Sequence, residues 1–166
     1  APPELVAEAQ RAALDEIEHA RVAFGVASAY AGAPVGPGKL DVPAAATNVD
    51  RRSVIRSVVA EACVGETLGV AEAIARAARE TDAELRAIHA TIAEDEKRHA
   101  ELAWRSLRWL LVDASSDELT LARTTFDEAI LACSEGAPDA ELHAARLAAI
   151  RDVIRPAADA IVSRAS

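Results

Sequence analysis

Residues 93–101 read Ala93-Glu94-Asp95-Glu96-Lys97-Arg98-His99-Ala100-Glu101 and lie inside a helical pattern that runs from about residue 82 to residue 112. Apolar residues recur along this pattern at the i, i+3, i+4, i+7 spacing of an amphipathic helix. Glu96 and His99 fall inside the apolar arc, one turn apart. Burying a carboxylate and an imidazole is costly unless they are paired, hydrogen-bonded or bound to a metal. Because residues i and i+3 are neighbours on a helix, both side chains can reach one point, as a pair of metal ligands would.

A second Glu-x-x-His motif, Glu16 and His19, lies in the helix predicted for residues 3–30. Glu16 lies within the apolar face of this helix and His19 lies on its flank, so the pattern predicts that this glutamate also points away from water. The apolar face consists of Leu5, Val6, Ala9, Ala13, Ile17, Ala20, Phe24 and Ala27. One Glu-x-x-His in a helical chain rich in glutamate is easily a coincidence, whereas two motifs with apolar-side glutamates indicate a shared site.

A third acid, Glu66, falls on the apolar face of the helix predicted for residues 51–79, whereas Glu61 falls on the solvent side. The next helix opens with Thr81-Asp82-Ala83-Glu84, a capping box that predicts a tight turn and an antiparallel hairpin. Glu66 lies fifteen positions before Thr81, and Glu96 lies fifteen positions after it. The hairpin should therefore bring these two carboxylates to the same height on facing sides.

Residues 31–50 are rich in Gly, Pro and Ala and show no periodicity, which predicts a linker. A linker of this length can return along the whole first helix, which would make the next helix parallel to the first. Two further helices are predicted for residues 116–133 and 139–162, and Pro156 should bend the second of them. The sequence thus predicts an all-α fold in which residues 1–166 form one domain, with three core helices, a long crossover and two C-terminal helices.

The composition excludes several classes of protein. The formal net charge of −9 argues against a nucleic-acid partner, which requires a basic surface. No apolar run approaches the roughly 20 residues that span a bilayer, so we expect no membrane association. Cys63 and Cys133 form neither a disulfide framework nor a zinc-binding spacing. The chain contains no methionine, so we expect that it has lost either its initiator or a longer piece. We expect a cytoplasmic location unless a signal sequence precedes Ala1.

Five side chains are candidate metal ligands: Glu16, His19, Glu66, Glu96 and His99. A set rich in oxygen with some nitrogen suits iron, or alternatively manganese, and bridging glutamates would hold two ions close together. Such a pair with an open coordination position could bind and reduce dioxygen. His89 and Asp95 border the same apolar face and are interpreted as residues that orient the ligands. The alternative for His89 is a core histidine, and the alternative for Asp95 is a surface salt bridge.

Three stretches resemble the ferritin-like di-iron carboxylate superfamily, and within it bacterial ferritin-like domain proteins of unassigned activity: Ala1–Val6, Cys63–Thr67 and Ala93–Trp104. The resemblance implies a ferritin-like four-helix-bundle architecture with a long crossover. Its helices carry, in order, a glutamate, Glu-x-x-His, a glutamate and Glu-x-x-His. By it, Glu16 and His19 match the second helix, Glu66 the third, and Glu96 and His99 the fourth. Nothing in this chain matches the first helix. We therefore expect a processed fragment in a homo-oligomer, with the missing helix supplied as a separate fragment or by a neighbouring subunit.

These observations favour a metal-binding protein with two iron ions that performs oxidase or oxygenase chemistry with dioxygen or peroxide. The alternative, from a different class, is a non-enzymatic ferritin-like scaffold that binds a partner helix or subunit, with a structural or lost metal. Iron storage is a third hypothesis, although no feature of the sequence indicates a cage. Neither the substrate nor the reaction follows from a resemblance in fold.

Overall fold

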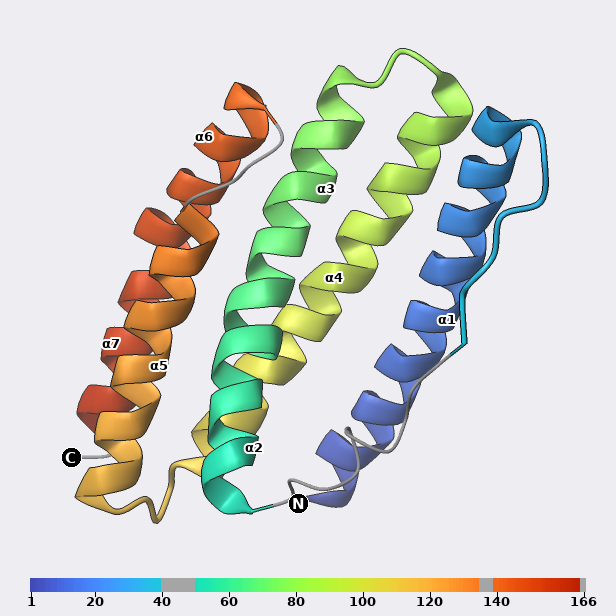
Figure 1. Cartoon of the computed structure of the whole chain (residues 1–166). Coiled ribbons are helices and arrows are strands. Elements are labelled where there is room, and N and C mark those ends of the chain that lie inside the picture. The colour runs from blue at the N-terminus through green and yellow to red at the C-terminus, as the bar shows by residue number, and fades with distance from the viewer. Residues whose placement is uncertain (40–49, 135–138, 165–166) are drawn as a thin grey trace.

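Every regular element in the described part of the chain, residues 1–39, 50–134 and 139–164, is helical in the computed structural model (Figure 1). The first helix is α1 (Pro3–Ala31), and the second is a continuous helix of α2 (Arg51–Ser57), the π-helical segment η1 (Val58–Glu66) and α3 (Thr67–Arg79). Next come α4 (Ala83–Leu110), α5 (Ser116–Ser134) and a last continuous helix of α6 (Ala140–Ala149), the π-helical segment η2 (Ile150–Ile154) and α7 (Arg155–Arg164). The predicted all-α fold is confirmed for these residues. Residues 40–49 of the predicted crossover lie outside the described residues.

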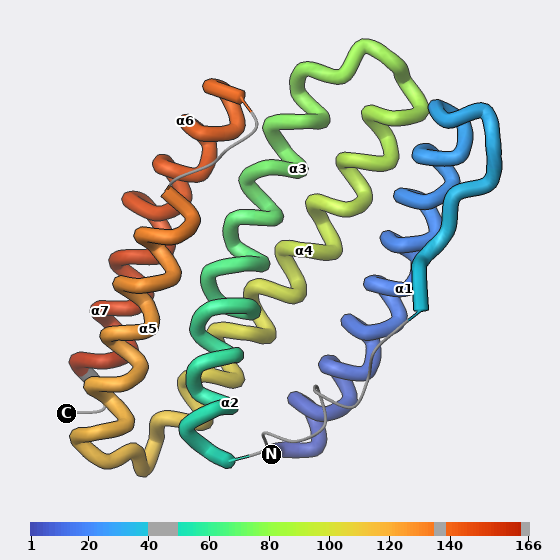
Figure 2. Tube along the Cα trace, viewed as in Figure 1, coloured from blue at the N-terminus to red at the C-terminus, as the bar shows by residue number. Residues whose placement is uncertain are grey.

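Three long helices carry the candidate ligands. α1 and the α2–η1–α3 helix run in the same direction, as the length of the linker predicts, and α4 runs opposite to both (Figures 1 and 2). The hairpin between α3 and α4 is tight, but the prediction that Thr81 caps α4 is wrong. Asp82 is the cap, and its Oδ1 accepts hydrogen bonds from the backbone N–H groups of Glu84 at 2.8 Å and Leu85 at 3.0 Å. A carboxylate at this position also interacts favourably with the positive end of the helix dipole.

The hydrophobic core lies between the α2–η1–α3 helix, the C-terminal half of α4 and the hairpin formed by α5 with α6–η2–α7. Its fully buried side chains come from all of these elements, and burying each one contributes roughly 1.5–3 kcal/mol. The largest are Ile55, Leu107, Leu111, Leu142, Ile154, Val59, Val64 and Cys63. Trp104 of α4 stacks on Phe126 of α5, with ring centroids 5.6 Å apart and ring planes 7° from parallel. The C-terminal hairpin therefore covers the side of the central helices that faces away from α1 (Figure 1).

α1 packs against α4 but buries no residue completely. Its partly buried positions include Leu5, Ala12, His19, Val22 and Val26, which form one stripe. Val6, Leu14 and Ile17 are exposed. The predicted apolar face of this helix is therefore rotated: the contact with α4 uses the neighbouring stripe, and Val6 and Ile17 face solvent. Neither α1 nor any other described helix is long and apolar enough to cross a membrane.

The two π-helical segments lie at distinctive points of the sequence. η2 ends two residues before Pro156, which has no backbone N–H to donate to the helix. η1 ends at Glu66, one of the candidate ligands. A π-helical turn holds more residues than an α-helical turn and so rotates the side chains that follow, and such turns are frequent at functional sites. The π-helical segment η1 thus ends at Glu66, the one candidate ligand that this helix supplies.

Candidate metal centre

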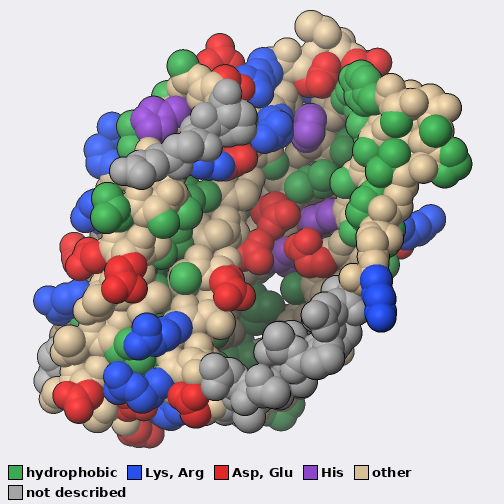
Figure 3. Space-filling model, viewed as in Figure 1, with side chains coloured by type: hydrophobic (Ala, Val, Ile, Leu, Met, Phe, Trp, Pro, Cys, Tyr) green, Lys and Arg blue, Asp and Glu red, His purple; other side chains and the backbone are tan. Residues whose placement is uncertain are grey.

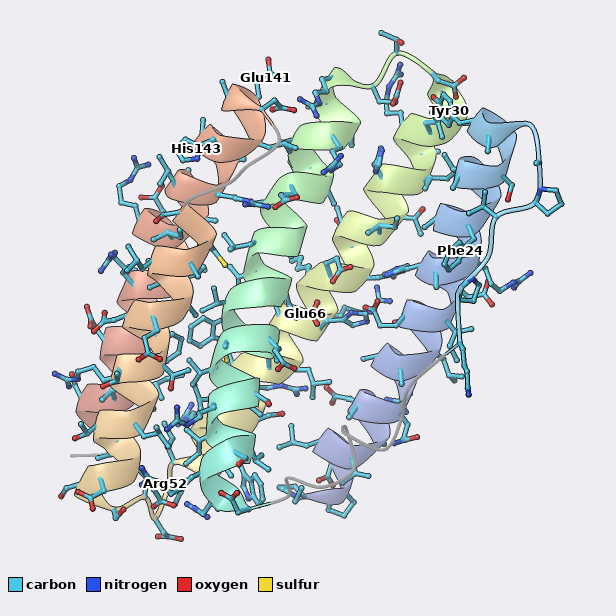
Figure 4. All side chains as sticks on the ribbon, in the orientation of Figure 1. Phe24, Tyr30, Arg52, Glu66, Glu141 and His143 are labelled. Atoms are coloured by element: carbon cyan, nitrogen blue, oxygen red, sulfur yellow. The ribbon has the colours of Figure 1, made fainter. Side chains whose placement is uncertain are left out.

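The candidate ligands come from three helices that meet near the middle of the bundle. α1 supplies Glu16 and His19, the end of η1 supplies Glu66, and α4 supplies Glu96 and His99. Glu66 points from its helix toward the space between α4 and α1 (Figure 4). The surface is hollowed between α1 and the α2–η1–α3 helix, and acidic and histidine side chains gather inside the hollow (Figure 3).

Four of the five predicted ligands converge on one point. One side-chain ligand atom from each of Glu16, Glu66, Glu96 and His99 lies within 4.8 Å of all the others. The Nδ1 atom of His99 is 3.2 Å from Glu16 Oε1, 3.6 Å from Glu96 Oε2 and 4.0 Å from Glu66 Oε2. Three carboxylates and an imidazole in this arrangement could hold a metal ion.

The fifth candidate, His19, lies beside this group rather than in it. Its Nδ1 atom is 3.5 Å from Glu96 Oε1 and 3.7 Å from Glu16 Oε1. This nitrogen is buried and has no hydrogen-bond partner among the described residues. The rings of His19 and His99 are 6.1 Å apart. Glu16 and Glu96 therefore lie between two imidazoles, each of which turns Nδ1 toward the carboxylates.

An aspartate lies behind each imidazole. The Nε2 atom of His19 is 3.0 Å from Asp95 Oδ2, and the Nε2 atom of His99 is 3.1 Å from Asp15 Oδ2. Each aspartate directly precedes the glutamate of its own helix and contacts the histidine of the other helix. With Nε2–H donated to an aspartate, each ring presents the Nδ1 lone pair to the cluster, which is the orientation that a metal-binding histidine requires.

Asp15 is a residue that the sequence reading missed. The signal that could have found it is the repeat of Asp-Glu-x-x-His, at Asp15–His19 on α1 and at Asp95–His99 on α4. Asp95 was predicted to orient a ligand, and its position behind His19 agrees with that role. Burial raises the pKa of Asp95, but hydrogen bonds from His19 and Arg98 outweigh burial, so the pKa falls below its usual value and the carboxylate stays charged.

The carboxylates of the cluster differ in exposure. The side chain of Glu96 is 14% exposed, Glu66 is 30% exposed and Glu16 is 53% exposed. The prediction that Glu16 points away from water is therefore wrong, because the hollow leaves its outer side open. Burial, together with the nearby Glu66 and Glu16, raises the pKa of Glu96 to about 8. Like charges this close repel each other by several kcal/mol at an effective dielectric near 20, so the cluster favours either a proton or a cation.

Gly69 of α3 lies next to the Glu96 carboxylate and has no side chain that could crowd it. A Cβ atom built on Gly69 would lie 3.7 Å from the Glu96 Cδ and Oε2 atoms, which is ordinary van der Waals contact. A methyl group would fit there, whereas a longer side chain would compete with the carboxylate for its position. The glycine thus leaves Glu96 free to present both oxygens to the cluster.

The remaining residues that the sequence singled out lie apart from the cluster. His89 is partly buried on α4 and makes no hydrogen bond or ion pair with any described residue, so its role as an orienting residue stays a prediction. Glu61 is exposed, as predicted. Cys63 is buried in the core, and burial raises the pKa of its thiol, so this cysteine is a packing residue and not a nucleophile.

The donor set therefore fits a hard or borderline metal ion. Carboxylate oxygens predominate, two imidazole nitrogens face them, and one of these nitrogens is buried without a hydrogen-bond partner among residues 1–39, 50–134 and 139–164. Comparison of the chain with protein-family models, with curated proteins and with solved structures finds no significant match.

Proposed function

We propose that this chain is a metal-binding protein of ferritin-like architecture, with two metal ions in the cluster of Glu16, His19, Glu66, Glu96 and His99. The observation that carries the proposal is the buried Nδ1 atom of His19, which faces two carboxylates and has no hydrogen-bond partner within the described part of the chain. A buried imidazole nitrogen without a partner costs free energy, and a bound cation would remove that cost.

The arrangement supports two ions rather than one. Glu96 turns a different oxygen toward each imidazole, with Oε1 3.5 Å from His19 Nδ1 and Oε2 3.6 Å from His99 Nδ1. Such a carboxylate can bridge two ions, one beside each histidine. Glu16 Oε1 also faces both rings, whereas Glu66 faces only His99. The ion beside His99 would then have Glu66 as an additional ligand, and the ion beside His19 would be more open.

Iron is the metal that we propose, with manganese as the alternative, because both accept mixed carboxylate and imidazole ligands. Bound iron would supply redox chemistry with dioxygen or peroxide. The chain's own contribution is to hold five donors in place, to orient both imidazoles through Asp15 and Asp95, and to leave one side open at Glu16. Glu16 is the most exposed of the three glutamates, so a small molecule would approach the centre from that side.

An anaerobic titration with iron(II) tests the proposal. We expect binding to approach two ions per chain, measured by elemental analysis after removal of free metal. The double variant Glu66→Ala with Glu96→Ala should lose binding. The matched control, Glu61→Ala with Glu94→Ala, removes two carboxyl groups from exposed positions on the same two helices and should bind normally. Absence of binding to the unaltered protein, or equal binding by both double variants, would overturn the proposal.

A second function is favoured by a different observation. α1 buries no residue completely and exposes Val6, Leu14 and Ile17 on the side that does not touch α4. An exposed apolar face of this kind would suit a scaffold that binds a partner helix or subunit there. Native mass spectrometry distinguishes the two functions: a metal-free particle with a bound second chain favours the scaffold, and a chain that retains metal without a partner favours the metal centre.

A further inference from the structure

One guanidinium joins the two aspartates that support the imidazoles. The Nη2 atom of Arg98 is 2.5 Å from Asp95 Oδ1 and 3.3 Å from Asp15 Oδ2. Asp95 in turn contacts His19, and Asp15 contacts His99. A continuous chain of polar contacts therefore runs from one imidazole to the other, through two carboxylates and a single arginine.

The two Asp-Glu-x-x-His motifs are not equivalent in this respect. Arg98 directly precedes His99 on α4, whereas Glu18 occupies the corresponding position before His19 on α1. Glu18 points outward and pairs with Arg21 at 2.7 Å. No second arginine contacts either aspartate among the described residues. The aspartates of both motifs thus contact one arginine, which belongs to the α4 motif.

Arg98 lies where solvent reaches the network. A cavity of about 370 Å³ between α1 and α4 is lined by Asp15, Arg98 and His99, and also by Arg105. Arg105 pairs with Glu8 across the same two helices but touches neither aspartate. It is therefore a matched control, because it makes an ion pair between α1 and α4 in the same cavity without contacting the histidine supports.

We infer that Arg98 is a positioning residue that couples the two imidazoles, holding Asp95 and Asp15 in the orientations that fix His19 and His99. The consequence of this role rests on the proposed metal centre: loss of Arg98 should lower metal affinity beside both His19 and His99. Loss of one aspartate weakens binding mainly beside the histidine that it contacts. Partners of metal-binding histidines typically change affinity by about 10–100-fold when removed. Arg98 acts one contact further from the metal than the aspartates do. We therefore expect its loss to lower metal affinity by about 3–10-fold beside each histidine.

The first experiment needs no metal. In protein labelled with ¹⁵N at histidine, NMR should show slowly exchanging Nε2–H protons for His19 and His99, because both are held by aspartates. The variant Arg98→Ala should accelerate exchange of both protons, and Arg105→Ala should accelerate neither. Methylguanidinium at millimolar concentration should restore the signals in Arg98→Ala, because the cavity is open to solvent. An effect on one histidine alone, or an equal effect of Arg105→Ala, would overturn the inference.

The second experiment measures cobalt(II) binding by its visible absorption. We expect Arg98→Ala to weaken both binding steps, and Asp15→Asn and Asp95→Asn to weaken one step each. Arg98→Lys should recover part of the affinity, because the ammonium keeps the positive charge but lacks the planar geometry of the guanidinium. A change in only one step for Arg98→Ala would contradict the coupling. If the unaltered protein binds no cobalt or iron while the NMR result holds, the proposed function fails and the positioning role of Arg98 stands.

Discussion

The Nε2 atom of His99 lies 3.1 Å from the Oδ2 atom of Asp15, although 84 residues separate them in the sequence. This contact connects α4 to α1 directly behind the candidate metal centre. A second contact connects the same helices, but here α1 supplies the histidine, His19, and α4 supplies the aspartate, Asp95. Because α1 has no fully buried residue, these two contacts add to its partly buried stripe in placing α1 relative to α4.

Replacing Asp15 should therefore affect both metal binding and the docking of α1. We expect Asp15→Asn to lower metal affinity by about 10–100-fold, because the amide no longer accepts a charge-assisted hydrogen bond from the imidazole. Competition with a coloured chelator measures the change. Glu18→Gln is the control, since Glu18 is exposed on the same helix and its ion pair with Arg21 does not involve the cluster. Equal affinities for the two variants would show that Asp15 does not support His99.

The raised pKa of Glu96 predicts a specific dependence of stability on pH in the metal-free protein. The carboxyl ionises near its ordinary value of 4.5 when unfolded and at about 8 when folded. Between these values the folded state retains a proton that the unfolded state has released, so the free energy of unfolding should fall as pH rises from about 4.5 to about 8. Metal binding must displace the same proton, so metal affinity should increase with pH across this window.

Urea denaturation in the presence of a chelator checks this pH dependence, with Glu96→Gln as the comparison. The amide cannot ionise, so the variant should gain stability relative to the unaltered protein as pH rises toward 8. The gain should be small below pH 4.5, where both states of the glutamate are protonated. Parallel stability profiles for the two proteins across this range would contradict the raised pKa of Glu96.

The helices were predictable from the sequence because their signals are local. The 3.6-residue period and the linker composition each act within a few turns. The start of α5 is equally local, because Ser115 N–H donates to Glu118 Oε2 at 2.8 Å within one turn. The convergence of Glu66 and Glu96 followed from counting along one tight hairpin, which is also a local constraint.

The orientation of α1 could not be predicted in the same way. Small alanine side chains lie on several sides of this helix, so more than one stripe can pack against a neighbour. The structure uses the stripe that contains Ala12 and His19, and this rotation exposes Ile17 and half-exposes Glu16. Asp15 was missed for the same reason. On a helical wheel it belongs to the polar stripe, and its role appears only once α4 is placed beside it.

The ion pair between Glu72 of α3 and Arg146 of α6 should contribute to docking of the C-terminal hairpin. Arg146 Nε donates to Glu72 Oε1 at 2.6 Å, and each side chain is 19% exposed. We expect Arg146→Ala to destabilise the protein by about 1–2 kcal/mol, because a largely buried carboxylate loses its closest partner. Arg151→Ala breaks an exposed pair with Asp152 and should cost about 0–0.5 kcal/mol. Denaturant titration of both variants measures the difference, and equal costs would show that burial adds nothing to the first pair.

The weak packing of α1 predicts that metal binding protects this helix selectively. Without metal, backbone amides of α1 should exchange with solvent faster than those of α4, because α1 contributes no fully buried side chain. Glu16 and His19 belong to α1 and the other three candidate ligands belong to the rest of the bundle, so ions bound between them would cross-link α1 to the core. Hydrogen exchange with and without iron(II) should therefore show increased protection in α1, with little change in α5. Glu16→Gln should abolish the increase in protection.

Leu14→Ala is the control for the outer face of α1. It should leave the increase in protection intact and cost less than about 0.5 kcal/mol of stability, because Leu14 is exposed. A larger cost would mean that another chain covers the outer face of α1, which would favour the scaffold function over the metal centre.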